Sequence, residues 1–202
     1  MKQIRSLFIG IGVSGVLLFV PVLVFGQVAL EPSYEVSLQF LTGSNEAGAK
    51  GTIPANLSNI AQRLKSSFGY SNYRLSETIL ARMSNLGEFQ YKAGTNIGAE
   101  IVSYSQSFLE LTINGLKSGQ TAKGTPGFQV QNLRIGARVP IATGSKKDED
   151  GKERLLINYE QIGVTFNKFG VAENVPTLIG TLEMPGAKDT LFLILNVKPV
   201  DL

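Results

Sequence analysis

"RIGARVPIATGS", residues 134–145, predicts a β-strand that is interrupted at a proline and then runs into a turn. Pro140 has no N–H to donate to a neighbouring strand, so it is expected to end strand pairing or to mark an edge or a bulge. Gly136 allows a bend or a close approach of two backbones, and together with Gly144 it allows a long strand to kink and turn. The stretch is therefore interpreted as backbone geometry and not as a catalytic motif.

Strand-like segments lie on both sides of this stretch. Residues 34–40 alternate apolar and polar side chains, which is the period of a half-buried strand. "YRLSETILARMS" (73–84) and "EFQYKAG" (88–94) flank "NLG" and predict a hairpin. Two further strands are expected at 99–106 and 108–116, and residues 118–127 are expected to form a loop.

Four strand-like runs close the chain: "FQVQNLRIGARVPI" (128–141), "RLLINYEQIGVTF" (154–166), "TLIGTLEM" (177–184) and "TLFLILNVKPV" (190–200). Short strands with turn signals between them indicate a mostly antiparallel structure. Leu191 to Leu195 contains no polar residue, so the last strand is expected to be covered on both faces. The expected fold class is α+β and β-rich, with a small strand–helix–strand–strand module followed by a mostly antiparallel β region.

Residues 56–69, "NLSNIAQRLKSSFG", predict a helix that packs on a sheet. One face of the helix carries the apolar side chains Leu57, Ile60, Ala61, Leu64 and Phe68. Asn56 is expected to cap the N-terminus, and Gly69 is expected to end the helix in a left-handed conformation. Arg63 and Lys65 supply too little positive charge for a helix that binds a membrane surface.

The chain opens with the features of a secretory signal peptide. Lys2 and Arg5 precede an uncharged apolar run, and Val24 and Gly26 are small enough for a cleavage site before Gln27. The alternative is an uncleaved membrane anchor, which the short run and its internal proline make less favourable. We expect residues 1–26 to be the signal peptide, 27–117 the α+β module and 118–202 the β-rich region, or one continuous domain from 27 onward.

The composition argues against most catalytic chemistry. The 202 residues include no His and no Cys, which removes the usual zinc ligands and the commonest nucleophile and base systems. No catalytic, cofactor-binding or metal-ligating residue is therefore assigned. Residues 145–154, "SKKDEDGKER", resemble part of a calcium loop, but basic residues alternate with the acids, so a solvated hairpin loop is expected.

The charge balance argues against a nucleic-acid partner. Without the leader, 17 basic and 16 acidic residues remain, a net charge of +1. No basic face of the kind that nucleic-acid binding needs is visible in the sequence. Membrane association of the mature chain is left open, but no transmembrane helix is expected in it.

The opening stretch has a second block after its polar loop. The first block consists of Gly136, Val139, Pro140, Thr143, Gly144 and Ser145, and the second of Tyr159, Glu160, Ile162 and Gly163. Fainter blocks follow in "VPTLIGTLEMPG" and "TLFLILNVKPV". In this order they resemble the β-domain of bacterial secretins, the outer-membrane channel proteins of secretion systems and type IV pili. The resemblance covers about residues 128–200 and lacks the lip region, because residues 167–174 are too few for its membrane-spanning strands of about 9–11 residues each.

The resemblance implies a bacterial, exported and non-catalytic cell-envelope protein, in the periplasm or at the outer membrane. Such a protein would act through protein–protein contacts in a secretion or pilus-related assembly, with self-association among the alternatives. The motif is also compatible with any β-sandwich that has a bulged strand. The alternative function is a free-standing periplasmic β-rich module that binds a small ligand or polymer, and an enzyme using Lys, Tyr or carboxylate chemistry comes third.

Overall fold

The computed structural model describes residues 31–46, 51–97, 105–184 and 189–200. The chain divides into two units, Met1–Leu30 and Glu31–Leu202. The proposed signal peptide and its cleavage site lie outside the described residues, as does most of the strand expected at 99–106. Everything below concerns the second unit.

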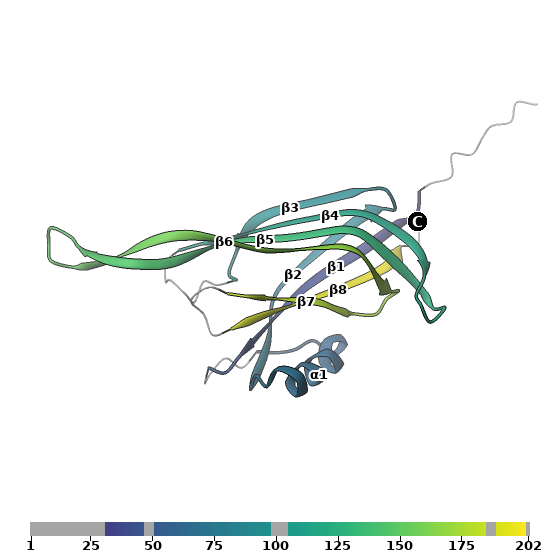
Figure 1. Ribbon diagram of the computed structural model, residues 1–202, viewed down its shortest axis with the longest axis horizontal. Coiled ribbons are helices and arrows are strands. Elements are labelled where there is room, and N and C mark those ends of the chain that lie inside the picture. The colour runs from purple at the N-terminus through teal and green to yellow at the C-terminus, as the bar shows by residue number, and fades with distance from the viewer. Residues whose placement is uncertain (1–30, 47–50, 98–104, 185–188, 201–202) are drawn as a thin grey trace, which may run out of the picture. The chain divides into compact units, whose positions relative to one another are not determined.

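Eight strands of the described chain form two antiparallel four-stranded sheets (Figure 1). The first sheet has the order β2 (Asn72–Ser84), β1 (Ser33–Ser44), β8 (Thr190–Val200) and β7 (Thr177–Glu183). The second has the order β3 (Glu88–Thr95), β4 (Ser107–Gln120), β5 (Pro126–Lys147) and β6 (Glu153–Ala172). The expectation of a β-rich, antiparallel fold with one strand–helix–strand arrangement is confirmed.

The main core lies between the two sheets. β5 contributes Leu133, Ile135 and Val139, and each of these side chains is fully buried. They alternate along the strand with more exposed residues, because successive side chains of a strand point to opposite faces. The alternation that the sequence displays around residue 135 is therefore the inward face of the second sheet.

A short helix covers the other face of the first sheet. It comprises a 3-10 turn, η1 (Ala55–Leu57), and α1 (Ser58–Phe68). Leu57, Ile60 and Leu64 pack against Phe192 and Ile194 of β8 in a second apolar cluster. The neighbouring residues of β8, Leu191, Leu193 and Leu195, point into the main core. The expectation that β8 is buried on both faces is confirmed, because one face meets the opposite sheet and the other meets α1.

The helix begins differently from the expectation. Asn56 was expected to be the N-terminal cap, but it lies inside the 3-10 turn, and no side chain of the described residues caps α1 at Leu57. The turn is started by Pro54, whose carbonyl accepts a hydrogen bond from the Leu57 N–H at 2.9 Å. The other end is as expected, because Gly69 has a φ of 70° and its N–H donates to the Lys65 carbonyl at 3.3 Å.

The expected hairpin between residues 73–84 and 88–94 is wrong. β2 pairs with β1, whereas β3 pairs with β4 in the opposite sheet. The reason is that the main core takes side chains from both strands: Ile79 and Met83 from β2, and the partly buried Phe89 and Tyr91 from β3. Placing the strands in opposite sheets lets both apolar faces meet across that core. The connecting turn is held by β4, because the Leu116 N–H donates to the Asn85 carbonyl at 2.9 Å.

Candidate functional site

The two sequence blocks lie side by side on the β5–β6 hairpin. The strands pair so that Gly136 lies opposite Gly163 and Pro140 lies opposite Tyr159. The remaining pairs are Val139 with Glu160, Ala137 with Ile162, Gly144 with Leu156 and Ser145 with Leu155. The motif is therefore spatially continuous, although the polar loop separates its two blocks in the sequence. Its role as a secretin-like element stays a prediction.

Pro140 lies where β5 has lost one of its neighbours. β4 pairs with β5 from Pro126 to Arg138, and beyond Arg138 β5 pairs with β6 alone among the described strands. A register shift between Ala142 and Gly144 follows. A residue without an N–H is tolerated at such an edge and next to such a bulge. Pro140 thus lies at an edge and near a bulge, as the sequence predicts. The strand is not interrupted there, because β5 continues to Lys147, so the turn expected at residues 143–145 is wrong.

The close backbone approach occurs at Gly163 and not at Gly136. A Cβ atom on Gly163 would lie 2.6 Å from the Ile135 carbonyl oxygen and 3.2 Å from the Gly136 Cα. A Cβ atom on Gly136 would meet nothing closer than 3.8 Å. The glycine of the second block is therefore the one that the hairpin geometry requires.

We predict that Gly163→Ala destabilises the protein and that Gly136→Ala does not. The added methyl group at 163 collides with backbone atoms that cannot rotate away, so the free energy of unfolding should fall by about 1–3 kcal/mol. Gly136→Ala should change it by less than about 0.5 kcal/mol, as substitutions without a steric conflict usually do. Urea titrations of both variants measure the difference. Equal losses would show that the register of the hairpin is wrong.

The distal half of the hairpin exposes apolar side chains. Beyond Arg138 it is a two-stranded ribbon that extends past the rest of the second sheet (Figure 1). Leu155, Leu156 and Ile157 are 57%, 50% and 42% exposed. Because these residues are consecutive, both faces of the ribbon carry apolar surface. An isolated two-stranded ribbon is only marginally stable in water, so this segment would gain stability from a cover.

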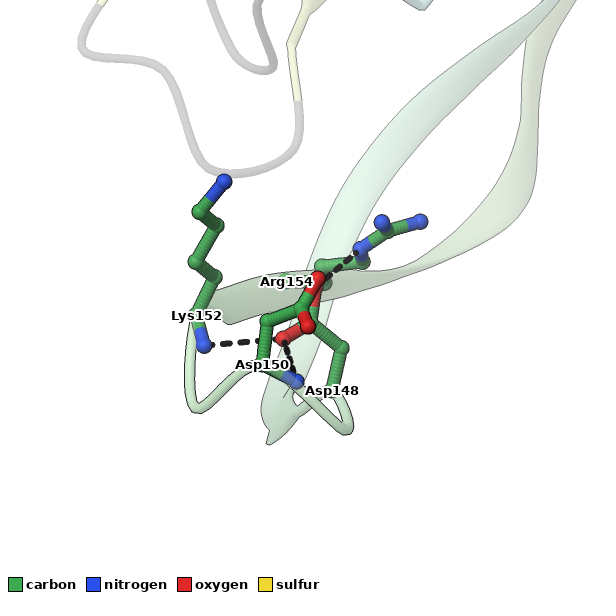
Figure 2. Close-up of polar contacts among 4 residues, drawn as sticks. All are labelled: Asp148, Asp150, Lys152 and Arg154. Atoms are coloured by element: carbon green, nitrogen blue, oxygen red, sulfur yellow. Dashed lines mark hydrogen bonds and ion pairs between the residues drawn. The ribbon is translucent and has the colours of Figure 1, made fainter.

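The tip of the hairpin is a turn organised by Asp148 (Figure 2). One carboxylate oxygen accepts hydrogen bonds from the N–H groups of Asp150 at 3.1 Å and Lys152 at 2.8 Å, and the other accepts from Arg154 Nε at 3.0 Å. The turn spans 148–152, which is narrower than the expected loop at 145–154, because the strands continue to Lys147 and from Glu153. The expected hairpin loop is confirmed, and the Asp148 carboxylate stabilises the turn through these three hydrogen bonds.

One outward position of the hairpin combines aromatic and basic side chains. The Arg138 guanidinium lies 5.7 Å from the centre of the Tyr159 ring, and the Phe108 ring lies 6.3 Å from it. On the neighbouring strands Lys92 Nζ lies 2.6 Å from a carboxylate oxygen of Glu110. This hydrogen bond holds the pKa of Glu110 below its ordinary value.

Among the described residues no group of three or more acidic side chains is placed to hold a metal ion.

Sequence reasoning missed the exposure of the segment at 155–157. The signal in the sequence is three consecutive apolar residues directly after the charged loop, where a half-buried strand would alternate. The exposure could not be derived from this signal, because it depends on the point at which β4 stops pairing with β5.

Comparisons with known proteins found two solved structures that are similar to this chain. No protein-family model and no curated protein matches it. Among solved structures it is similar to the type IV competence pilus secretin PilQ of V. cholerae, with 12% identity, a TM-score of 0.38 and coverage of 85% of this chain and 62% of that chain. It is also similar to the SPI-1 type III secretion injectisome secretin InvG of Salmonella (residues 176 to the end, open gate state), with 12% identity, a TM-score of 0.25 and coverage of 85% and 58%.

Both proteins are secretins, the family that residues 128–200 resemble in sequence. The chain spans less than two thirds of either matched chain. In the described part of the chain, no helix combines the length and the apolar character needed to span a membrane.

Proposed function

We propose that this chain is an exported, non-catalytic cell-envelope protein of secretin-like type that acts through protein–protein contacts in a secretion or pilus-related assembly. The observation that carries the proposal is the distal β5–β6 ribbon, with apolar side chains exposed on both faces. Large exposed apolar side chains that gather on one segment mark a candidate site of contact with another protein. The proposed location, the periplasm or the outer membrane, rests on the leader pattern before Gln27.

The edges of the second sheet supply a second support. β6 and β3 are its outer strands, so within the described chain one edge of each pairs with no other strand. Unpaired edges of this kind are templates for pairing with another chain. If β6 of one copy pairs with β3 of the next, the contact is head-to-tail and forms a ring when the rotation closes. Self-association is therefore the form of assembly that we propose.

The assembly is tested with the exported full chain on native gels and by analytical ultracentrifugation. We expect a large homo-oligomer. Replacement of residues 143–156 by Asn-Gly would shorten the ribbon, because Ala142 and Ile157 are partners in register and Asn-Gly favours a tight hairpin turn. This variant should melt cooperatively but form a weaker oligomer, because it lacks the exposed Leu155 and Leu156 and keeps the β3 and β6 edges. A wild-type chain that stays a compact monomer would contradict the proposal.

The alternative is a free-standing periplasmic module that binds a small ligand or polymer. A concave region of about 570 Å³ lies where β4 and β6 end and β5 begins, between Lys117, Gly127 and Gly170. Its open form favours a polymer over an enclosed small molecule. A monomeric wild-type chain that retains polysaccharide on an affinity gel would favour this alternative.

Export is tested at the N-terminus. The leader pattern, with Val24 and Gly26 before Gln27, predicts that the mature protein begins at Gln27 or at pyroglutamate formed from it. N-terminal mass spectrometry of the exported protein measures this directly. A protein that retains Met1 and fractionates with membranes would indicate an uncleaved anchor instead.

A further inference from the structure

β7 is an edge strand with a free side. It pairs with β8 from Thr177, opposite Leu195, to Glu183, opposite Thr190, with a register shift between Leu178 and Gly180. No other strand of the described chain pairs with its second edge. The N–H and C=O groups on that edge are therefore available to an additional strand.

A groove lies between this strand and the helix. α1 packs on β1, β2 and β8, and its apolar cluster includes no residue of β7. The gap that results has a volume of about 340 Å³. It is lined by Ile60, Arg63, Leu64, Ser67 and Phe68 of α1 and by residues 175–178.

The groove exposes large apolar side chains to solvent beside its polar ones. Phe68, Val175 and Leu178 are 48%, 50% and 38% exposed, and all three line the groove. Leu178 lies opposite Ile194 in the sheet, and Ile194 packs beneath α1. Because paired residues point to the same face, Leu178 continues the apolar surface of the helix cluster outward to the sheet edge.

The charge at the groove is positive. Among the described residues that line it, Arg63 is the only charged one. α1 contains Arg63 and Lys65 and no acidic residue. In the described part of the chain no ion pair involves Arg63. A guanidinium group in this position would be complemented by a carboxylate, with which it forms a strong charge-assisted hydrogen bond.

We propose that this groove binds an extended segment of a partner protein, which adds a strand to β7 and places apolar side chains beside Phe68 and Leu178 and a carboxylate at Arg63. Strand addition supplies affinity through main-chain hydrogen bonds, and the groove supplies specificity for alternate side chains. An extended occupant fits better than a helical one, because a helix would leave the free edge of β7 unpaired. The proposal concerns a surface different from the β5–β6 ribbon and goes beyond the proposed function.

The test begins with a random dodecapeptide library displayed on phage and selected on the immobilised full chain. We expect enriched peptides in which apolar residues alternate with others and at least one Asp or Glu is present. The most enriched sequence is then synthesised with a fluorescent label, and its binding is measured by anisotropy. Arg63→Glu should weaken binding by about tenfold or more, because it opposes like charges. Lys65→Glu is the matched control on the same helix and should leave binding within about twofold, since this residue does not line the groove.

Two further measurements complete the test. A peptide methylated on alternate backbone nitrogens should not bind, because it cannot pair with β7. Thermal melts of both variants should match the wild type, which separates lost binding from lost folding. The proposal is overturned if selection on the wild type enriches no peptide that selection on a Leu178→Lys variant does not, or if methylation has no effect on binding. It is also overturned if the Leu178→Lys variant, in the absence of peptide, fails to form the oligomer that the wild type forms. The last result would make a second copy the occupant. The shortened-ribbon variant keeps this groove, so peptide binding and assembly can fail separately.

Discussion

A chain truncated after Asp189 is expected to lose its cooperative fold. The deleted residues 190–202 include β8, which pairs with β1 on one side and with β7 on the other. Leu191, Phe192, Leu193, Ile194, Leu195 and Val197 of this strand are all buried. Burial of such a side chain contributes about 1.5–3 kcal/mol, so these six together contribute roughly 9–18 kcal/mol. This is comparable with the whole stability of a typical domain, which is about 5–15 kcal/mol.

The topology adds to this loss. Without β8, β7 has no pairing partner among the described strands, and the apolar residues of α1 lose the Phe192 and Ile194 side chains on which they pack. The truncated chain should therefore be insoluble, or soluble with no sigmoidal transition in a urea titration followed by circular dichroism.

The shortened-ribbon variant is the matched control, because it also removes residues from the chain but takes them from an exposed segment. It should retain the transition. A soluble chain ending at Asp189 that unfolds cooperatively would contradict the prediction, and would make the last strand a docking segment for another subunit.

The elements that could be predicted from the sequence are those whose pattern is decided locally. The uninterrupted apolar run at Leu191–Leu195 can be satisfied only by cover on both faces, and β8 has that cover. The helical spacing of Ile60 and Leu64 and the left-handed Gly69 likewise depend on neighbours in the sequence.

The features that could not be predicted depend on contacts between distant segments. An alternating pattern tells which face of β2 is buried but not which strand is its neighbour, so the pairing of β2 and β3 was wrong. The requirement for glycine at residue 163 follows from its register with Gly136, which no local pattern fixes. The start of α1 differs for a related reason, because the turn at Pro54 competes with side-chain capping by Asn56.

The candidate site shows the same division. The second motif block and the first as far as Val139 could be assigned to strands from the sequence. The turn expected after Pro140 is wrong, because β5 continues to Lys147 and the turn begins only at Asp148. The exposure of the ribbon could not, because it arises from the end of β4 pairing at Arg138. Likewise, the groove beside β7 exists because α1 packs on β1, β2 and β8 and leaves the last strand of the sheet uncovered.

Leu64→Ala is expected to reduce the free energy of unfolding by about 2–5 kcal/mol, the range for deleting a buried leucine side chain. Leu64 is 3% exposed and packs in the cluster that joins α1 to Phe192 and Ile194. Truncation removes apolar contacts from the centre of this cluster and leaves a cavity that the rigid sheet beneath cannot close. The groove on its outer side admits water, so we expect the loss toward the lower end of that range.

Lys65→Ala is the matched control, because it truncates the next residue on the exposed side of the same helix. It should change the free energy of unfolding by less than about 0.5 kcal/mol, as surface substitutions usually do. Alanine favours the helical conformation at least as well as leucine or lysine, so neither result can be attributed to helix propensity. Urea titrations of the two variants under one buffer condition give the comparison. Equal losses would show that Leu64 does not lie on the face of α1 that packs on β8. The lining of the groove beside β7 would then be wrong as well.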